Sequence, residues 1–176
     1  MKRLLLVALM VHVTMVGMVG FNRAGNATAN TTNGAGGTLQ AIVNDGRPAN
    51  AKMDWRFYAS SDFGLYQYDA ENIGYLSYNI VRVNQKLVLN DRGATNLVRE
   101  LGKGYDNVKE IVIIREIDYT GKNIRIVGLI YFSDNGRVIK RESYEPKEWD
   151  SIIPDSVDDV LYQAVSECLV SARILN

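Results

Sequence analysis

VKEIVIIREIDYTGKNIRIVGLIYFSDNGRVIKRESY, residues 108–144, is the stretch of the chain that decides its fold. It predicts three strands, over residues 108–119, 123–133 and 138–144. In the first, Ile111, Ile113 and Ile117 share one face, as alternation requires. Asn135 and Gly136 supply the positive φ that a tight hairpin turn needs. Connections this short join antiparallel neighbours and leave no room for helical crossovers.

Strand-like patterns continue N-terminal to this stretch. Residues 79–89 alternate apolar and polar side chains and predict a half-buried strand. Two aromatic segments, residues 55–58 and 65–68, are strand-prone and are separated by a turn composition, SSDFG. Residues 93–104 predict a short helix, with Gly102 and Gly104 bracketing its end.

The end of the chain predicts a longer helix. Pro154 cannot continue a strand ladder, and Ser156 with Asp159 three residues later suits a capping-box-like start. The apolar stripe follows the i, i+3, i+4 rhythm and consists of Val157, Val160, Leu161, Ala164, Val165, Cys168 and Leu169. Asp158 and Asp159 are placed outside that stripe, as partners of the helix dipole. We therefore predict an α+β domain over residues 54–176, with one antiparallel sheet of five or six strands and this C-terminal helix on one face.

The first 29 residues predict a secretory signal. A basic start is followed by an apolar run over residues 4–21 and a small-residue cleavage site at 27–29. Retention of this run as a membrane anchor stays open, because its length is near the lower limit for spanning a bilayer. If the signal is cleaved, no stable membrane span remains. Residues 30–53, rich in Asn, Thr and Gly, predict a flexible linker.

Cleavage would change the chemistry available to the chain. It leaves 17 basic residues against 20 acidic ones, a net charge of −3, with no basic patch for nucleic acid. It also removes His12, the only histidine, and with it every mechanism based on imidazole. No metal or cofactor site is predicted.

Several short motifs resemble one known family when they are taken in order. After the Trp55 strand they are Tyr68-Asp69, Asn72-Ile73, Val81-Arg82-Val83, Glu116-Ile117-Asp118, Asp134-Asn135-Gly136, Trp149-x-x-Ile152-x-Pro154-x-Ser156 and a helix ending in Cys168. This arrangement resembles the surface-adhesin protein E family of Gram-negative bacteria. The resemblance implies a small exported domain in the periplasm or at the cell surface, with no catalytic residues and no cofactor.

Two positions depart from the pattern that the resemblance implies. Asn84 stands where the family continues its strand with tryptophan, and Tyr119 stands where a cysteine would pair with the helix cysteine. The family's disulfide therefore cannot form here. Cys168 lies on the apolar stripe near the C-terminal end of its helix, where the dipole disfavours a thiolate, so it predicts an inert core thiol. An intermolecular disulfide is the alternative.

The residues favour a protein-binding, adhesin-like module over an enzyme. The candidate binding surface is aromatic and consists of Trp55, Tyr58, Tyr66, Tyr68 and Tyr75. The structural motif consists of Asp69, Tyr119, Trp149, Pro154, Ser156 and Cys168. One alternative is a carboxylate-dependent hydrolase, for which Glu116 and Asp118 on one strand face are candidates, although acids on the outer face of a sheet are usually solvated. A structural accessory of the envelope is the other.

Overall fold

The computed structural model describes residues 52–145 and 148–174. The predicted signal and nearly all of the predicted linker lie outside these residues. The strands are β1 (Trp55–Ser61), β2 (Gly64–Asp69), β3 (Gly74–Tyr75), β4 (Ile80–Leu89), β5 (Val108–Asp118), β6 (Asn123–Ser133), β7 (Val138–Ser143) and β8 (Asp150–Ser151). The helices are α2 (Asp91–Leu101), a short 3₁₀ turn (Lys103–Tyr105) and α3 (Val157–Ile174).

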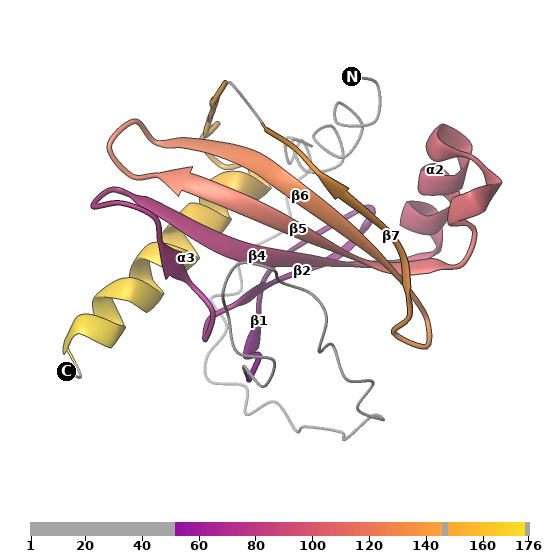
Figure 1. Ribbon diagram of the computed structural model, residues 1–176, viewed down its shortest axis with the longest axis horizontal. Helices are drawn as coiled ribbons and strands as arrows, with labels where there is room; N and C mark the ends of the chain where they lie inside the picture. The colour runs from indigo at the N-terminus through magenta and orange to yellow at the C-terminus, as the bar shows by residue number, and fades with distance from the viewer. Residues whose placement is uncertain (1–51, 146–147, 175–176) are drawn as a thin grey trace.

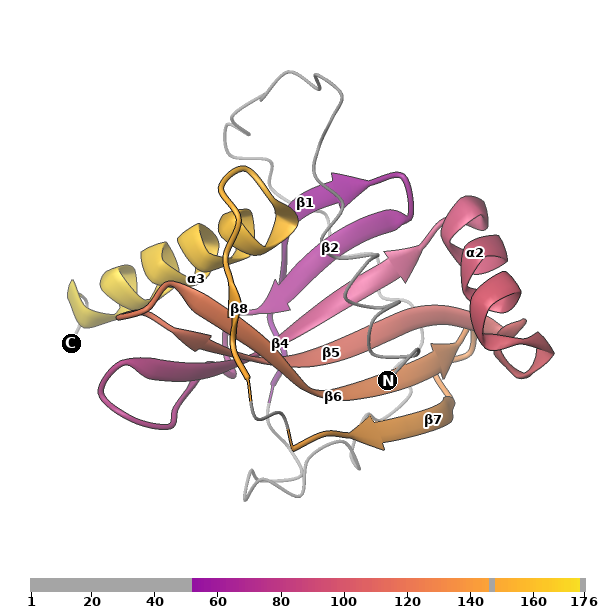
Figure 2. The same cartoon turned by 90° about the horizontal axis from the view of Figure 1, so that it is seen from above.

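The strands form one sheet in which every paired neighbour is antiparallel. Six strands follow the order β1-β2-β4-β5-β6-β7, and the two-residue strands β3 and β8 pair with β4 and β6 outside this path (Figure 2). The hairpin between β6 and β7 turns at Gly136, whose φ of 75° is positive as predicted, whereas Asn135 does not have the positive φ that the sequence also predicts for it. The predicted antiparallel sheet is confirmed.

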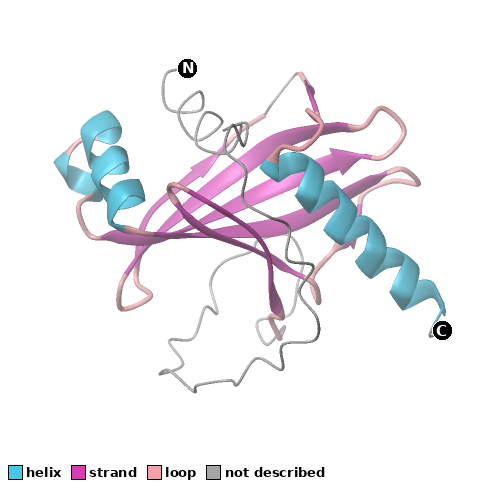
Figure 3. Ribbon diagram, turned by 180° about the vertical axis from the view of Figure 1, so that it is seen from behind, coloured by secondary structure: helices cyan, strands magenta, loops and turns pink. Residues whose placement is uncertain are grey.

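The two helices lie toward opposite ends of the sheet (Figures 1 and 3). Under α3, Leu161 and Val165 pack against Val83 and Ile117 of the sheet. Near α2, Leu97 packs into a second cluster that includes Ile111 of β5. Both helices therefore cover the same sheet face, the one that carries the alternating apolar positions of β4 and β5. The predicted α+β fold, with its C-terminal helix on one face of the sheet, is confirmed.

The first turn of α3 differs from the prediction in one residue. Ser156 is the cap as predicted, because its hydroxyl accepts the backbone N–H of Asp159 at 3.2 Å. Asp158, however, does not face solvent: it is 1% exposed. It lies on the buried stripe, three residues before Leu161, and its carboxylate meets Arg115 at 3.2 Å.

The start of α2 also lies earlier than expected. Asn90 caps the helix, since its side-chain oxygen accepts the N–H of Gly93 at 2.8 Å. Gly102 ends the helix with φ of 97°, a left-handed conformation that favours glycine, as the predicted bracketing glycines imply. The predicted helix therefore exists, with bounds shifted by two to three residues.

The opposite face of the sheet has a small hydrophobic cluster of its own. Val112, Ile130 and Phe132 are buried there, with Trp55 and Ile114 packed against them. Lys86 lies over the Trp55 ring, 4.5 Å from its centroid. The central strands β5 and β6 are thus apolar on both faces. Their side chains are buried also on the face that the helices do not cover.

Candidate functional site: the tyrosine pocket

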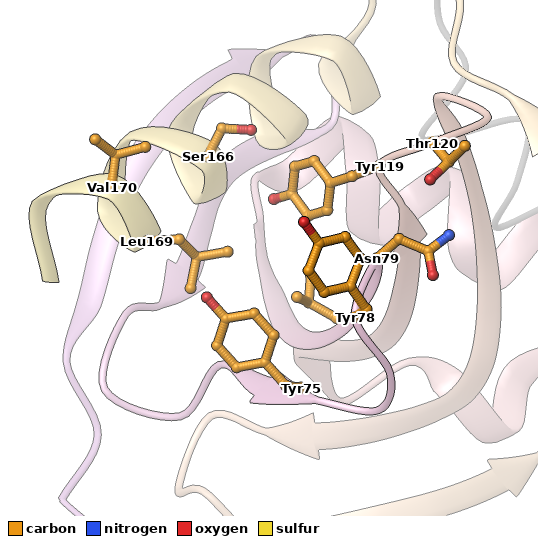
Figure 4. A pocket seen from close by; sticks show the side chains of 9 residues that line it. Tyr75, Tyr78, Asn79, Tyr119, Thr120, Ser166, Leu169 and Val170 are labelled. Atoms are coloured by element: carbon orange, nitrogen blue, oxygen red, sulfur yellow. The ribbon is translucent and has the colours of Figure 1, made fainter. Parts of the chain in front are cut away.

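A pocket of about 320 Å³ lies between the C-terminal half of α3 and two turns of the sheet (Figure 4). We call it the tyrosine pocket. It is lined by Tyr75, Tyr78, Asn79, Val81, Tyr119, Thr120, Ser166, Leu169 and Val170. Tyr75 and Tyr78, from β3 and the turn after it, and Tyr119, from the turn after β5, form its walls with the aliphatic side chains of α3.

The backbone ties the two turns of the sheet together. The segment between β3 and β4 closes when the N–H of Leu76 donates to the carbonyl of Ile80 at 2.9 Å. The N–H of Tyr119, just after β5, donates to the carbonyl of Asn79 at 2.9 Å. The Asn79 side chain also donates to Asp118 at 2.8 Å. These bonds hold the walls of the pocket in register beside α3.

The pocket carries no charged side chain among the residues that line it. Burial raises the pKa of Tyr119 to about 12. Tyr119 therefore stays neutral at physiological pH. Its ring lies 5.0 Å from that of Tyr162, which supports it from the side of α3.

The rim of the pocket is apolar and exposed. Tyr78 is 99% exposed and Val170 58%, and Tyr75 is about half exposed. Large apolar side chains that gather on one exposed site, around a concave pocket, are typical of a surface that contacts another molecule. This arrangement makes the tyrosine pocket the candidate functional site.

A family model, surface-adhesin protein E, matches residues 65–168, which is more than half of the chain. The chain belongs to the surface-adhesin protein E family. The match spans the sheet from β2 onward and most of α3, so it includes seven of the nine residues that line the tyrosine pocket, whereas Leu169 and Val170 lie beyond it. Neither the curated proteins nor the solved structures gave a match.

The aromatic surface predicted from the sequence is only partly a surface. Tyr66 and Tyr68 are 0% and 6% exposed and belong to the core, so they need correction: their side chains point to the helix-covered face. Tyr58 is largely buried between them, with ring centroids 6.1 and 6.2 Å away. Trp55 lies on the opposite face of the sheet, under Lys86. Tyr75 alone reaches the pocket.

Two of the motif residues on which the family resemblance rests, Asp69 and Trp149, make contacts within the fold. Asp69 is buried and accepts hydrogen bonds from the N–H of Asp54 and the amide of Asn72, at 3.1 and 2.7 Å. Trp149 lies under the guanidinium of Arg125, 4.1 Å from the ring centroid. Pro154 is exposed just before the Ser156 cap.

Cys168 and Tyr119 pack against the same core cluster, as the implied pairing of those two positions requires. The Cys168 thiol is half-buried and lies 3.9 Å from the carbonyl of Ala70. Tyr119, in place of the implied cysteine, instead supplies a wall of the pocket.

The two acids that a hydrolase would need are both engaged by neighbours. Glu116 is 3% exposed, which corrects the expectation that it is solvated. Its two carboxylate oxygens bind Arg82 and Arg125, each at 2.6 Å. Asp118 accepts hydrogen bonds from Asn79 and from the N–H of Thr120, at 2.8 and 3.0 Å. Neither acid lines the tyrosine pocket.

Replacing Glu116 with glutamine should make the free energy of unfolding depend less on pH in the acid range. Burial raises the pKa of Glu116, but hydrogen bonds from Arg82 and Arg125 outweigh it and leave the pKa below its usual value. Its stabilisation is therefore complete above the unfolded-state pKa of about 4.3 and disappears as pH falls through the lower folded-state pKa. In urea titrations, the gap between wild type and Glu116→Gln should be largest at neutral pH and narrow below about pH 4. A gap that does not change with pH would contradict this.

Eight of the nine residues that line the pocket lie outside the predicted surface, among them Tyr78, Leu169 and Val170. A sequence signal for two of them exists, because Val170 follows Leu169 at the edge of the apolar stripe of α3. Val170 widens the apolar stripe of α3, and a helix that packs on a sheet leaves the edge of a wide stripe exposed. No helix among the described residues is long and apolar enough to cross a membrane. Those residues also contain no cluster of His, Cys, Asp or Glu able to hold a metal.

Proposed function

We propose that this protein is an exported, non-enzymatic module of the bacterial envelope or cell surface that binds other proteins through the tyrosine pocket. The observation that carries the proposal is the rim, where Tyr75, Tyr78 and Val170 are exposed together around a concave site. Membership of the surface-adhesin protein E family supports a role in surface contacts. The engagement of Glu116 and Asp118 by arginine and amide groups disfavours acid–base chemistry.

The partner binds mainly by burial of apolar surface. Tyrosine is enriched in protein interfaces because one end of its side chain is apolar and the other can stay in contact with water. A few central residues usually provide most of the binding free energy of such a surface. We expect Tyr75 and Val170, which stand on opposite walls of the pocket, to be among them.

Capture of the partner should depend on the pocket. The full chain is immobilised and exposed to envelope fractions and, separately, to a panel of matrix and plasma proteins. Val170→Glu, which places a charge on the apolar rim, should reduce the amount of any specifically captured protein at least about tenfold. Val138→Glu is the matched control, since Val138 is 41% exposed on β7 and does not line the pocket.

Thermal melting of both variants checks that they fold equally well. Equal capture by wild type and both variants would overturn the proposal that the pocket binds protein. A partner from the envelope fraction would identify an accessory of the bacterial surface, and one from the matrix panel an adhesin; either supports protein binding when it is lost with Val170→Glu alone.

A further inference from the structure

One polar atom of the tyrosine pocket has no hydrogen-bond partner. The hydroxyl oxygen of Tyr119 is shielded from solvent and forms no hydrogen bond within the described part of the chain. Burial raises the pKa of Tyr119 to about 12, so the hydroxyl keeps its proton at neutral pH and can both donate and accept. A buried hydroxyl without a partner costs free energy, because folding removes it from water and does not replace the bonds that water made.

The polar neighbours of Tyr119 in the pocket are engaged elsewhere. Ser166, on α3, donates its hydroxyl proton to the carbonyl of Tyr162 at 2.6 Å. The side chain of Asn79 donates to Asp118 at 2.8 Å. Solvent does not supply the missing bond either, because the Tyr119 oxygen is buried. The hydroxyl is therefore available to a polar atom of a ligand that enters the pocket.

The other walls of the pocket determine the kind of ligand. None of the lining side chains is charged, and most of them are aromatic or aliphatic. The volume of about 320 Å³ is at the lower end of the roughly 300–1,000 Å³ that is usual for ligand pockets. A charged group would lose its hydration here, and a sugar ring would bury several hydroxyl groups against one partner. An uncharged aromatic ring with one polar atom fits both the walls and the Tyr119 hydroxyl.

We propose that the tyrosine pocket receives the side chain of one tyrosine of the partner protein, whose hydroxyl group forms a hydrogen bond with that of Tyr119. This inference rests on the proposed function and names the group by which the partner is recognised. A phenol carries its polar atom at the far end of the ring, so it can reach the buried oxygen while the ring packs against Leu169 and Val170. The rim admits the ring because Tyr78, which is 99% exposed, has little packing to lose when it turns aside.

Two capped amino acids that differ by one hydroxyl group test this pairing on the full chain. They are N-acetyl-tyrosinamide and N-acetyl-phenylalaninamide, and NMR chemical-shift titration measures the dissociation constant of each. The wild-type protein should bind the tyrosine amide about fivefold more tightly, which corresponds to the net contribution of one hydrogen bond. In Tyr119→Phe this advantage should disappear, because the phenol hydroxyl of the ligand is then buried without a partner.

Tyr58→Phe is the matched control. The Tyr58 hydroxyl is also buried without a hydrogen-bond partner among the described residues, but Tyr58 does not line the pocket. This variant should keep the preference for the tyrosine amide within about twofold of wild type. Both substitutions remove an unpartnered hydroxyl, so neither should lower the melting temperature. A lower melting temperature for Tyr119→Phe alone would show that its hydroxyl has a partner within the protein and would overturn the inference.

Two further variants locate amide binding in the pocket. Val170→Glu should weaken both amides at least about tenfold, whereas Val138→Glu should leave their affinities within about twofold of wild type. Amide binding that Val170→Glu does not change lies elsewhere and contradicts the inference. Equal affinity of wild type for the two amides, a preference that survives Tyr119→Phe, saturation by methyl glucoside, or no binding of either amide would each overturn it as well.

Failure of this inference can be told apart from failure of the proposed function. If Val170→Glu abolishes capture of a partner protein but the tyrosine amide has no advantage, the pocket is a protein interface that does not recognise a tyrosine. If Val170→Glu leaves capture of every partner unchanged, the proposed function fails, and this inference fails with it.

Discussion

Replacing Asp158 with alanine should destabilise the fold by about 3–5 kcal/mol, the largest single effect that we expect. Asp158 and Arg115 face each other between α3 and the sheet, with side chains 2% and 1% exposed and an Oδ1–Nη1 distance of 3.2 Å. Removing the carboxylate leaves the guanidinium buried without its counter-charge. That uncompensated charge is what makes the loss of one partner so costly.

Urea unfolding followed by circular dichroism measures this effect, as a shift in the midpoint at unchanged slope. Glu167→Ala is the matched control, because it removes an exposed acid from the same helix and should change stability by no more than about 0.5 kcal/mol. The double variant Arg115→Leu with Asp158→Leu should recover most of the lost stability, since paired apolar replacements are often neutral. A loss of 1 kcal/mol or less for Asp158→Ala would show that the pair does not hold α3 to the sheet.

The sequence places Arg115 and Asp158 at positions where apolar residues are expected, but it does not show that they pair with each other. Arg115 stands between Ile113 and Ile117 on a face that is otherwise apolar, and Asp158 precedes Leu161 and Val165 at helical spacing. A charge on a predicted buried face is usually assigned to solvent, and an acid in a first helical turn to the dipole. Only the register of α3 against β5 shows that each charge has the other as its partner.

The sheet itself was predictable because its signals are local. Alternation along β4 and β5 and the Asn-Gly turn after β6 define antiparallel neighbours without any long-range information. The continuous apolar runs at residues 111–114 and 129–132 also indicate that both faces of these strands are buried.

The tyrosine pocket could not be predicted in the same way, because its walls come from β3, from the turn after β5 and from α3. Tyr66 and Tyr75 are both tyrosines in an aromatic segment, yet one is in the core and the other on the rim. The two residues are of the same type and have similar neighbours in the sequence, so only their positions in the fold distinguish them.

Replacing Tyr119 with cysteine should create a disulfide with Cys168 and stabilise the domain. Both side chains pack against the cluster under α3, and the family resemblance implies a cysteine at this strand position. A cross-link between residues 119 and 168 closes a loop of about 50 residues, for which the loss of unfolded-state entropy predicts roughly 4 kcal/mol. Native-state strain usually reduces the gain, so we expect about 2–4 kcal/mol between the oxidised and reduced forms.

The comparison within one variant separates the cross-link from the loss of the tyrosine. Mass spectrometry of the oxidised Tyr119→Cys protein should show the loss of two hydrogens and no reactive thiol, and urea unfolding with and without reductant gives the stabilisation. Tyr119→Ser, which has no thiol at 119, should respond to reductant no more than wild type. Two reactive thiols after oxidation, or equal stability of the oxidised and reduced forms, would show that position 119 does not face Cys168 closely enough.

The same variant also tests what this chain gains from Tyr119 in place of the cysteine that the family resemblance implies. Tyr119 packs its ring 5.0 Å from that of Tyr162 and forms a wall of the tyrosine pocket, two contacts that a disulfide cannot supply. If the pocket binds a partner as proposed, Tyr119→Cys should gain stability and lose binding together. A stabilised variant that captures the partner as well as wild type does would instead assign Tyr119 to helix packing alone, with the pocket defined by Tyr75, Tyr78 and the aliphatic side chains of α3.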